Sequence, residues 1–175
     1  MARSRGVGTL IDLLVDATVE HLSAQIEAGV DCVQLFDSWA GILPDEEIAR
    51  WVIEPTARIA GALKKRHPGT RIIGFPRGAG TMLGDYAREA GVDAVGLDYT
   101  VPLQAGRALQ TQLPVQGNLD PILLLVGGEA METRIREIRK TLSRKAHIFN
   151  LGHGILPTTP PEHVAALVAA VRARP

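Results

Sequence analysis

The sequence predicts an α/β protein built on a parallel sheet. Five times along the chain an apolar stretch typical of a strand leads into a polar or glycine-containing loop and then into a helical stretch. The junctions read LFDSWAG, GFPRGAG, LDYTVP, QGNLDP and FNLGHGILP. Parallel strands place the loops that follow them at one edge of the sheet, where α/β proteins carry their chemistry. A closed eight-stranded barrel takes about 250 residues, whereas this chain has 175.

The chain is expected to open with an amphipathic helix that ends near Gly29. Apolar residues recur at helical spacing over residues 11–26, and glycine commonly follows the last turn of a helix. The first strand is expected at residues 30–36. A second helix should begin near Asp45, which is a good N-cap residue. Pro55 should kink or divide that helix, because proline removes a backbone donor.

The remaining strands are expected to be short. They are predicted at residues 71–75, 93–97, 114–117 and 146–150. Residues 129–143 alternate acidic and basic side chains, which is typical of a solvated helix face joined by i,i+4 ion pairs. A closing helix is expected at residues 162–171, after two prolines suited to a first turn. No linker or composition shift marks a boundary, so a single domain over residues 1–175 is predicted.

The composition excludes several classes of protein. Hydrophobic residues make up 46% of the chain and charged residues 22%, which is neither a disordered nor a membrane composition. Basic and acidic residues both number 19, so the net charge is zero and the basic excess usual in nucleic-acid binders is missing. No uncharged stretch reaches about 18 residues, the minimum for a membrane-spanning helix. Neither a nucleic acid nor a membrane is expected as a partner.

Cys32 is the only cysteine in the sequence, so an intrachain disulfide is excluded. It lies in the apolar stretch VDCVQLF, where we expect a small buried hydrophobic residue; a reactive thiol or a metal ligand is the alternative. Sparse cysteine use favours a reducing, cytoplasmic compartment. The first residues are weakly reminiscent of a signal peptide, but acidic residues at 12 and 16 fit an amphipathic helix better.

The loop after the first strand carries Asp37 and Ser38. A hydroxyl and nearby backbone amides at the carboxyl end of a strand could face a ligand. Alternatively, Asp37 or Ser38 bonds to its own backbone in a turn, and the spacing leaves both readings open. The G-x-S-x-G pattern of a nucleophile elbow is missing, which disfavours a serine hydrolase.

The loop after the second strand carries Arg77 among glycines. The guanidinium is a fork of donors suited to an anion. The loop has neither the lysine followed by serine or threonine of a P-loop nor the glycine spacing of a dinucleotide-binding fingerprint. A plain strand-to-helix turn explains the glycines, and Arg77 is the candidate anion ligand.

Three further candidates follow the later strands. Asp98 could bind a cation or a donor-rich substrate. Asn118, together with Asp120, is suited to capping a helix or bracing a loop. His153 stands between two glycines, where the backbone can approach a ligand closely and the imidazole can donate to an anion.

The other four histidines are expected at ordinary surface or core positions; they are His21, His67, His147 and His163. Two or three histidines at metal-ligand spacing do not occur in the sequence, so no zinc site is expected.

Four stretches of the chain resemble the uroporphyrinogen decarboxylase family. They are LFDSWAG, GLDYT, QGNLDP and above all FNLGHGILPTTPPEHV, and they occur in the family's order over essentially the whole chain. The resemblance implies a (β/α)8 TIM barrel that forms cytoplasmic homodimers. It also implies removal of the four acetate carboxyls of uroporphyrinogen III to give coproporphyrinogen III, in haem and chlorophyll biosynthesis, without a metal or other cofactor. The five units here are then expected to be a partial TIM barrel, its C-terminal portion.

The resemblance also assigns roles to residues. Ser38 and His153 match two positions that hydrogen-bond substrate carboxylates, and Phe36 resembles part of the apolar wall of the cleft. Arg77, Asp98 and Asn118 are expected near the pocket without a family role.

The sequence departs from the family pattern in three features. An arginine motif of the R-Q-A-G-R-Y type is missing, and so are the aspartate that holds the pyrrole N–H groups and a tyrosine nearer the middle of the family sequence. That aspartate would stabilise the cationic intermediate that releases carbon dioxide, and losing one such group elsewhere costs about 10²–10³ in rate. No catalytic residue is therefore expected in this chain.

Three readings remain at this point. The chain is the C-terminal portion of a decarboxylase, or a non-catalytic porphyrinogen-binding or interaction protein derived from the same barrel. The third is a related corrinoid-dependent methyltransferase, which needs a zinc-binding His/Cys set that Cys32 alone does not supply. If the chain is an isolated C-terminal portion of a decarboxylase, open sheet edges would favour self-association.

Overall fold

The structure is a computed structural model, and it describes residues 2–173. Five strands alternate with helices, as the sequence predicts. The strands are β1 Cys32–Asp37, β2 Arg71–Pro76, β3 Ala94–Gly96, β4 Val115–Gln116 and β5 His147–Ile148. They follow one another across the sheet in chain order, and β1 pairs with β2, β2 with β3, and β4 with β5, each in parallel. The predicted α/β architecture with a parallel sheet is confirmed.

Helices connect successive strands, and one helix precedes the first strand and another follows the last strand. The longer helices are α1 Ala2–Glu27, α3 Glu54–Arg66, α7 Gly128–Leu142 and α8 Pro161–Arg172. The shorter ones are α2 Asp45–Ile48, α4 Leu83–Glu89, α5 Leu103–Leu109 and α6 Pro121–Val126. Single turns of other helix types are η1 Ala40–Ile42, η2 Ala49–Ile53 and η3 Gly80–Met82. None of the helices within residues 2–173 is long and apolar enough to cross a membrane.

The chain divides into two compact units, residues 1–95 and residues 96–175. The boundary falls within β3. The sequence carries no linker at this point, so the boundary could not be located from composition. The prediction of a single domain stays a prediction.

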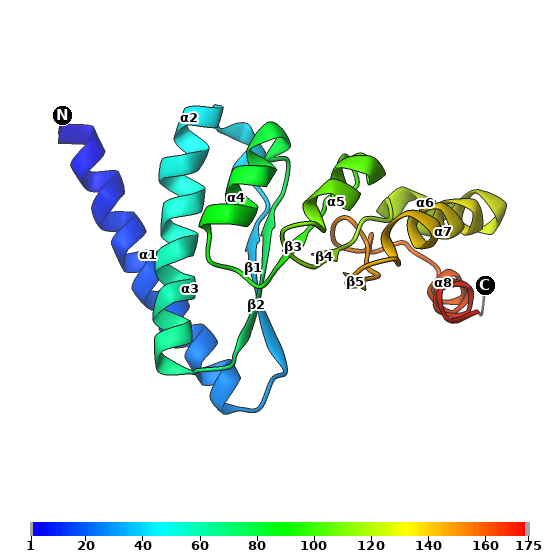
Figure 1. Cartoon of the computed structure of the whole chain (residues 1–175), viewed down its shortest axis with the longest axis horizontal. Coiled ribbons are helices and arrows are strands. Elements are labelled where there is room, and N and C mark those ends of the chain that lie inside the picture. The colour runs from blue at the N-terminus through cyan, green and yellow to red at the C-terminus, as the bar shows by residue number, and fades with distance from the viewer. Residues whose placement is uncertain (1, 174–175) are drawn as a thin grey trace. The chain divides into compact units, whose positions relative to one another are not determined.

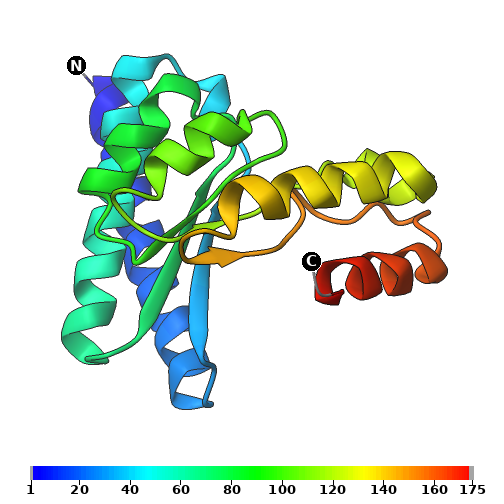
Figure 2. The ribbon, with the colours of Figure 1, turned by 45° about the vertical axis from the view of Figure 1, so that its right-hand side comes forward.

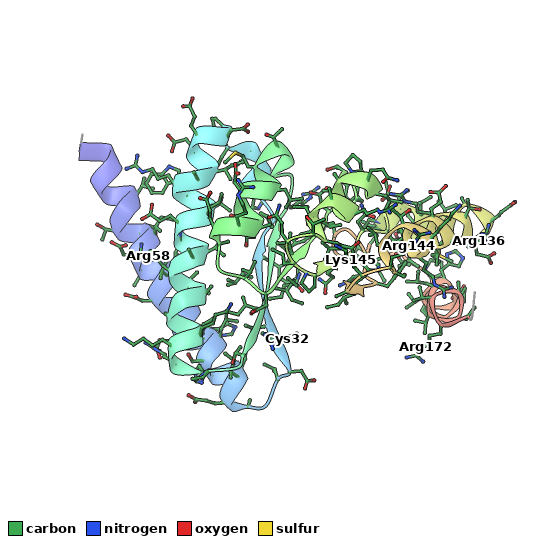
Figure 3. All side chains as sticks on the ribbon, viewed as in Figure 1. Cys32, Arg58, Arg136, Arg144, Lys145 and Arg172 are labelled. Atoms are coloured by element: carbon green, nitrogen blue, oxygen red, sulfur yellow. The ribbon has the colours of Figure 1, made fainter. Side chains whose placement is uncertain are left out.

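In the first unit α1 and α3 lie side by side and pack near the sheet (Figure 1). Both helices contribute buried apolar side chains at helical spacing. These are Val15, Val19 and Leu22 from α1, with Ile59, Ala60 and Leu63 from α3. At the surface the Arg58 guanidinium lies 2.8 Å from the Asp12 carboxylate, and Figure 3 labels Arg58 on α3. Both side chains are well exposed, so this ion pair contributes little to stability.

The helix expected from Asp45 onward is divided, as Pro55 predicts. An α-helical turn gives way to the π-helical turn η2, and α3 begins directly after it with Pro55 in its first turn. Proline is tolerated there because the first backbone N–H groups of a helix have no partner within it. The predicted N-cap role of Asp45 is wrong. Pro44 occupies the N-cap position, and the Asp45 carboxylate instead accepts a 3.0 Å hydrogen bond from the Thr81 hydroxyl.

The expectation that Cys32 is buried is also wrong, because its side chain is exposed. Cys32 is the first residue of β1, and β1 stands at one end of the sheet order. Figure 3 labels it at the end of this strand that follows α1. An apolar stretch predicts burial only where both faces of a strand are covered, and only Val33 in β1 is fully buried.

The second unit packs α7 through one apolar stripe. Its fully buried side chains recur at helical spacing, and they are Met131, Ile135, Ile138 and Leu142. The helices α7 and α8 lie side by side (Figure 2), joined by a 2.8 Å hydrogen bond from the Arg139 guanidinium to the Ala173 carbonyl. Ion pairs on the outer face of α7 join Arg136 with Glu132 at 3.7 Å and Arg134 with Glu137 at 3.2 Å. The predicted solvated face is confirmed for these residues.

Candidate functional site

In the first unit the loops that follow β1 and β2 are joined through the backbone of Arg77. The Arg77 N–H donates to the Asp37 carbonyl at 2.9 Å, and the Arg77 carbonyl accepts from the Gly41 N–H at 2.9 Å. A side chain at Gly41 would place its Cβ 2.4 Å from the Gly78 carbonyl oxygen. Glycine is therefore required for the two loops to touch. The loop that carries Ser38 is held by the loop that carries Arg77.

Ser38 is half-buried in the turn after β1. The carboxylate of Asp37 accepts a 3.1 Å hydrogen bond from the Trp39 N–H, so the turn that the sequence allowed as the alternative is present. Phe36 is 68% exposed and packs edge-to-face on the buried Phe75, with ring centroids 5.6 Å apart. The exposed ring of Phe36 and the hydroxyl of Ser38 come from residues two apart on the same strand end.

Tyr86 is buried below these loops. Burial raises the pKa of Tyr86 to about 12; a hydrogen bond with Thr56 opposes the shift, and the charge of Asp37 adds to it. A Cβ at Gly74 would lie 2.3 Å from the Tyr86 hydroxyl oxygen. Gly74 in β2 thus leaves room for the phenol. This side chain packs the base of the first unit and stays protonated at neutral pH.

In the second unit Asp98 and Asn118 are brought together and both are buried. The Asn118 amide donates to the Val101 carbonyl at 2.7 Å and to the Asp98 carbonyl at 3.3 Å. The Asp98 carboxylate accepts from the Thr100 N–H at 2.7 Å. The predicted bracing role of Asn118 is confirmed. The Asn118 side-chain oxygen is a buried acceptor with no partner among the described residues.

Gly152 lies directly against the backbone that follows Asp98. A Cβ at Gly152 would lie 2.2 Å from the Tyr99 nitrogen, a distance that no side chain could occupy. The Gly152 N–H donates to the Leu119 carbonyl at 2.7 Å. His153 follows and is half-buried. The close approach of the flanking glycines to a ligand stays a prediction; a Cβ at Gly154 has no atom within 4 Å. Gly152 also allows close approach to Tyr99.

His147, on β5, is another histidine of this unit, and its ring is held by a hydrogen bond. Its Nε2 lies 2.6 Å from the Gly117 carbonyl oxygen. Burial lowers the pKa of His147, and the hydrogen bond to Gly117 opposes that shift. The neutral ring therefore donates to a backbone carbonyl, which agrees with the prediction of an ordinary packed histidine.

The candidate residues fall into two groups. Phe36, Ser38 and Arg77 belong to the first unit, whereas Asp98, Asn118 and His153 belong to the second. Within each unit the loops that carry them are in backbone contact. Phe36 lies near the carboxyl end of β1, and the other five residues follow the carboxyl ends of their strands, as expected for an α/β site. Among residues 2–173 no three His, Cys, Asp or Glu side chains are grouped to hold a metal ion.

The structure adds Gly41 and Gly152 to the residues that shape the site. Sequence reasoning did not single out either contact. The glycines in these loops can be seen in the sequence. The atoms that leave no room for a side chain, however, belong to loops distant in sequence. Spacing alone could not identify the carbonyl of Gly78 or the backbone of Tyr99 as their neighbours.

Comparison with known proteins identifies relatives along the whole chain. The family model described as Uroporphyrinogen decarboxylase (URO-D) matches residues 2–174. A protein of Rhizorhabdus wittichii named uroporphyrinogen decarboxylase is 57% identical over 168 residues, covering 95% of this chain and 49% of that protein. One of the same name from Rhodospirillum rubrum is 50% identical over 173 residues, covering 98% of this chain and 50% of its own length. The chain spans about half the length of the curated relatives it matches.

Among solved structures, a methyltransferase from Methanosarcina mazei superposes with a TM-score of 0.76 at 22% sequence identity. The match covers 91% of this chain and 47% of the methyltransferase, and at that identity it shows a shared fold alone. The fold is thus a partial, barrel-like arrangement of strand and helix units. The match of the family model over nearly all 175 residues shows that the chain belongs to the uroporphyrinogen decarboxylase family.

Proposed function

We propose that this chain is the C-terminal portion of a cytoplasmic uroporphyrinogen decarboxylase and supplies part of its substrate site. The observation that carries the proposal is the family match, which extends along nearly the whole chain. The reaction would convert uroporphyrinogen III to coproporphyrinogen III with release of four carbon dioxide molecules. Both units would belong to one barrel domain of the complete enzyme, which forms a homodimer.

In this proposal Ser38 and His153 hydrogen-bond carboxylates of the tetrapyrrole. Support comes from their placement, since both are half-buried in loops that follow the carboxyl ends of strands. A hydroxyl and an imidazole can each donate to a carboxylate oxygen, and such charge-assisted bonds are stronger than neutral ones. The exposed ring of Phe36 would supply an apolar surface for the pyrrole rings.

Arg77, Asp98 and Asn118 are proposed to shape the pocket. The backbone of Arg77 ties the Ser38 loop to its neighbour, and Asn118 ties the Asp98 loop to Val101. These contacts support a role in positioning the loops that carry Ser38 and His153. The Arg77 guanidinium remains a candidate for a substrate carboxylate, because it follows the carboxyl end of β2, which pairs with the end of β1 that precedes Ser38.

Decarboxylation proceeds when a protonated pyrrole carbon makes a cationic intermediate that can lose carbon dioxide. A carboxylate near the pyrrole nitrogens would stabilise that charge. The family motif that carries this aspartate is missing from the sequence. In the complete enzyme this aspartate would belong to the half of the sequence that this chain does not span.

Binding of uroporphyrin, the oxidised analogue of the substrate, tests the site. Fluorescence titration should show that Ser38→Ala and His153→Ala each weaken binding by about tenfold or more, the effect of losing a hydrogen bond to a charged group. Ser143→Ala, at an exposed position after α7, is the matched control and should bind as the parent chain does. Unchanged affinity in both site variants would remove the assignment.

The second candidate is a non-catalytic porphyrinogen-binding or interaction protein built from the same half barrel. The missing arginine and aspartate motifs favour it for the chain as given. An assay of coproporphyrinogen formation separates the two candidates. Appreciable turnover by this chain alone would exclude the binding-only function, whereas turnover only after addition of the other half of a decarboxylase would support the first.

A further inference from the structure

A groove of about 390 Å³ lies between α5 and α7 in the second unit, and none of its lining residues is a candidate site residue. Arg107 from α5 and Lys140 from α7 line it, together with Arg144 just beyond the end of α7. Its volume is near the lower end of the range for small-molecule sites, about 300–1,000 Å³. The hydroxyl of Thr141 and the amide of Gln104 are further polar groups in its lining.

The three cations are not neutralised by neighbouring acids in the described part of the chain. No hydrogen bond or ion pair joins the side chain of Arg107, Lys140 or Arg144 to any residue from 2 to 173. Glu137 also lines the groove, but its carboxylate pairs with Arg134 at 3.2 Å. The groove therefore gathers three positive charges, and Glu137, the one acid among the described residues that line it, already has a partner.

Helix dipoles account for part of this charge. Arg107 lies in the last turn of α5 and Lys140 in the last turn of α7, where cations are favourable. Each helix end carries roughly half a negative charge, so two ends offset about one of the three cations. Arg144 lies beyond the last residue of α7, where the effect of the dipole falls off. Capping of helix dipoles alone does not explain the cluster.

The two helices that form the groove are firmly joined. The buried Gln110 amide donates to the Leu142 carbonyl at 2.9 Å and to the Ala146 carbonyl at 3.2 Å. The Lys145 ammonium donates to the Gln110 carbonyl at 3.3 Å. Gly106 allows α5 to pack closely, because a Cβ there would lie 2.6 Å from a methyl group of Leu97. The backbone segments that carry the cations are thus held together, although the three side chains are exposed.

We propose that this α5–α7 groove binds a small anion with two or more linked phosphate groups. Guanidinium forks and an ammonium reach it from two helices and from the segment after α7, and tetrahedral phosphates accept donors from several directions. A concave groove of this volume suits a small ligand. The zero net charge of the chain offers no long-range attraction for a nucleic-acid polymer.

The test is a calorimetric titration of the full chain with inorganic tripolyphosphate, carried out at low and at moderate salt. Saturable binding at one site is expected. Arg107→Gln and Arg144→Gln should each weaken it by about tenfold or more, the effect of one lost charge-assisted hydrogen bond. The matched control is Arg136→Gln, which removes the same charge from a position on α7 outside the groove; Figure 3 labels both Arg136 and Arg144. Affinity of the control should stay within about twofold of the parent.

Several outcomes would overturn the proposal. One is no saturable binding of tripolyphosphate at millimolar concentration, and another is equal weakening in Arg136→Gln and Arg144→Gln. Tighter binding of citrate than of tripolyphosphate would replace linked phosphates with carboxylates as the ligand class. Binding of single-stranded DNA without any binding of tripolyphosphate would assign the groove to nucleic acid. Circular dichroism of each variant checks that lost binding does not reflect unfolding.

Discussion

Gly152 determines where His153 can lie. The backbone of Gly152 is pressed against Tyr99, while its N–H is held by the Leu119 carbonyl at 2.7 Å. Two strand-end loops are thus fixed relative to each other by one residue without a side chain. This contact therefore sets the position of the backbone that carries the His153 imidazole. Gly152 has no side chain, but it is part of the proposed substrate site because it positions the imidazole of His153.

Gly152→Ala should lower the free energy of unfolding by about 1–3 kcal/mol, the usual cost of overpacking. The added methyl would lie 2.2 Å from the Tyr99 nitrogen, and a backbone cannot give way as a side chain does. Urea denaturation measures the change. Gly154→Ala is the control, because no atom lies within 4 Å of a Cβ at that position. Equal stability of the two variants would contradict the close packing of this loop.

His147 should make the stability of the protein depend on pH. Burial lowers its pKa in the folded state below the ordinary value of about 6.5. Below that value the unfolded chain binds the proton more readily than the folded one, so stability is full at neutral pH and falls on acidification. The fall should begin near pH 6.5 and continue to the lowered pKa.

The measurement compares urea unfolding of the parent chain and of His147→Gln between about pH 7.5 and pH 5. The parent should lose more stability than the variant over this range, because glutamine does not titrate. An NMR titration of the His147 ring gives the folded-state pKa directly. Parallel pH profiles for the two proteins, or a ring that titrates above 6.5, would refute the effect of burial.

At the scale of elements, α6 begins with a side-chain cap. The Asp120 carboxylate accepts a 2.9 Å hydrogen bond from the Ile122 N–H, and Pro121 occupies the first helical position. Both features satisfy or remove backbone donors that a helix leaves unpaired at its start. The strand-end loop QGNLDP thus holds a loop brace in Asn118 and a helix cap in Asp120, as the sequence predicted.

Asp120→Ala should destabilise the protein by about 1 kcal/mol, the usual cost of losing an N-cap. Asp120→Asn should restore most of that loss, since its side-chain oxygen can accept the same hydrogen bond. Chemical denaturation of the three proteins at one pH gives the comparison. A variant with asparagine no more stable than the one with alanine would assign the effect to charge and not to the cap.

The order of the elements could be predicted because each strand is an apolar stretch that ends in a turn-forming loop. A helical stretch was predicted after LDYTVP, but the bounds of α5 were not, since its sequence LQAGRAL is short and carries a glycine. Gly106 is explained by its close packing on Leu97, a contact that sequence spacing does not reveal. Burial of Cys32 was predicted wrongly, because a local apolar pattern does not tell whether a strand lies at the end of a sheet.

The candidate site was predictable to a lesser extent. The strand-end positions of Ser38 and His153 follow from the alternation of strands and helices, and the bracing role of Asn118 follows from its residue type. The role of the Arg77 backbone in joining two loops did not follow, because its partners Asp37 and Gly41 are about forty residues away along the chain. The substrate contacts of Ser38 and His153 stay predictions.

At the scale of the whole molecule, a large apolar surface is exposed on α1. Val7, Leu10, Leu13 and Leu14 are between 45% and 65% exposed. The end strands β1 and β5 also lack an outer neighbour within the described residues. Contiguous apolar surface and open strand edges both favour association between protein molecules.

The chain should therefore self-associate at micromolar to millimolar concentration, with a weight-average mass that rises with concentration in sedimentation equilibrium. Leu10→Glu combined with Leu14→Glu should reduce the association, because it places two charges in the apolar face of α1. The control, Ala130→Glu combined with Thr158→Glu, adds the same charge at exposed positions of the second unit. If both double variants reduce association equally, net charge is responsible. If neither does, the strand edges and not α1 hold the molecules together, since the edges donate and accept backbone hydrogen bonds that surface charge on α1 does not block.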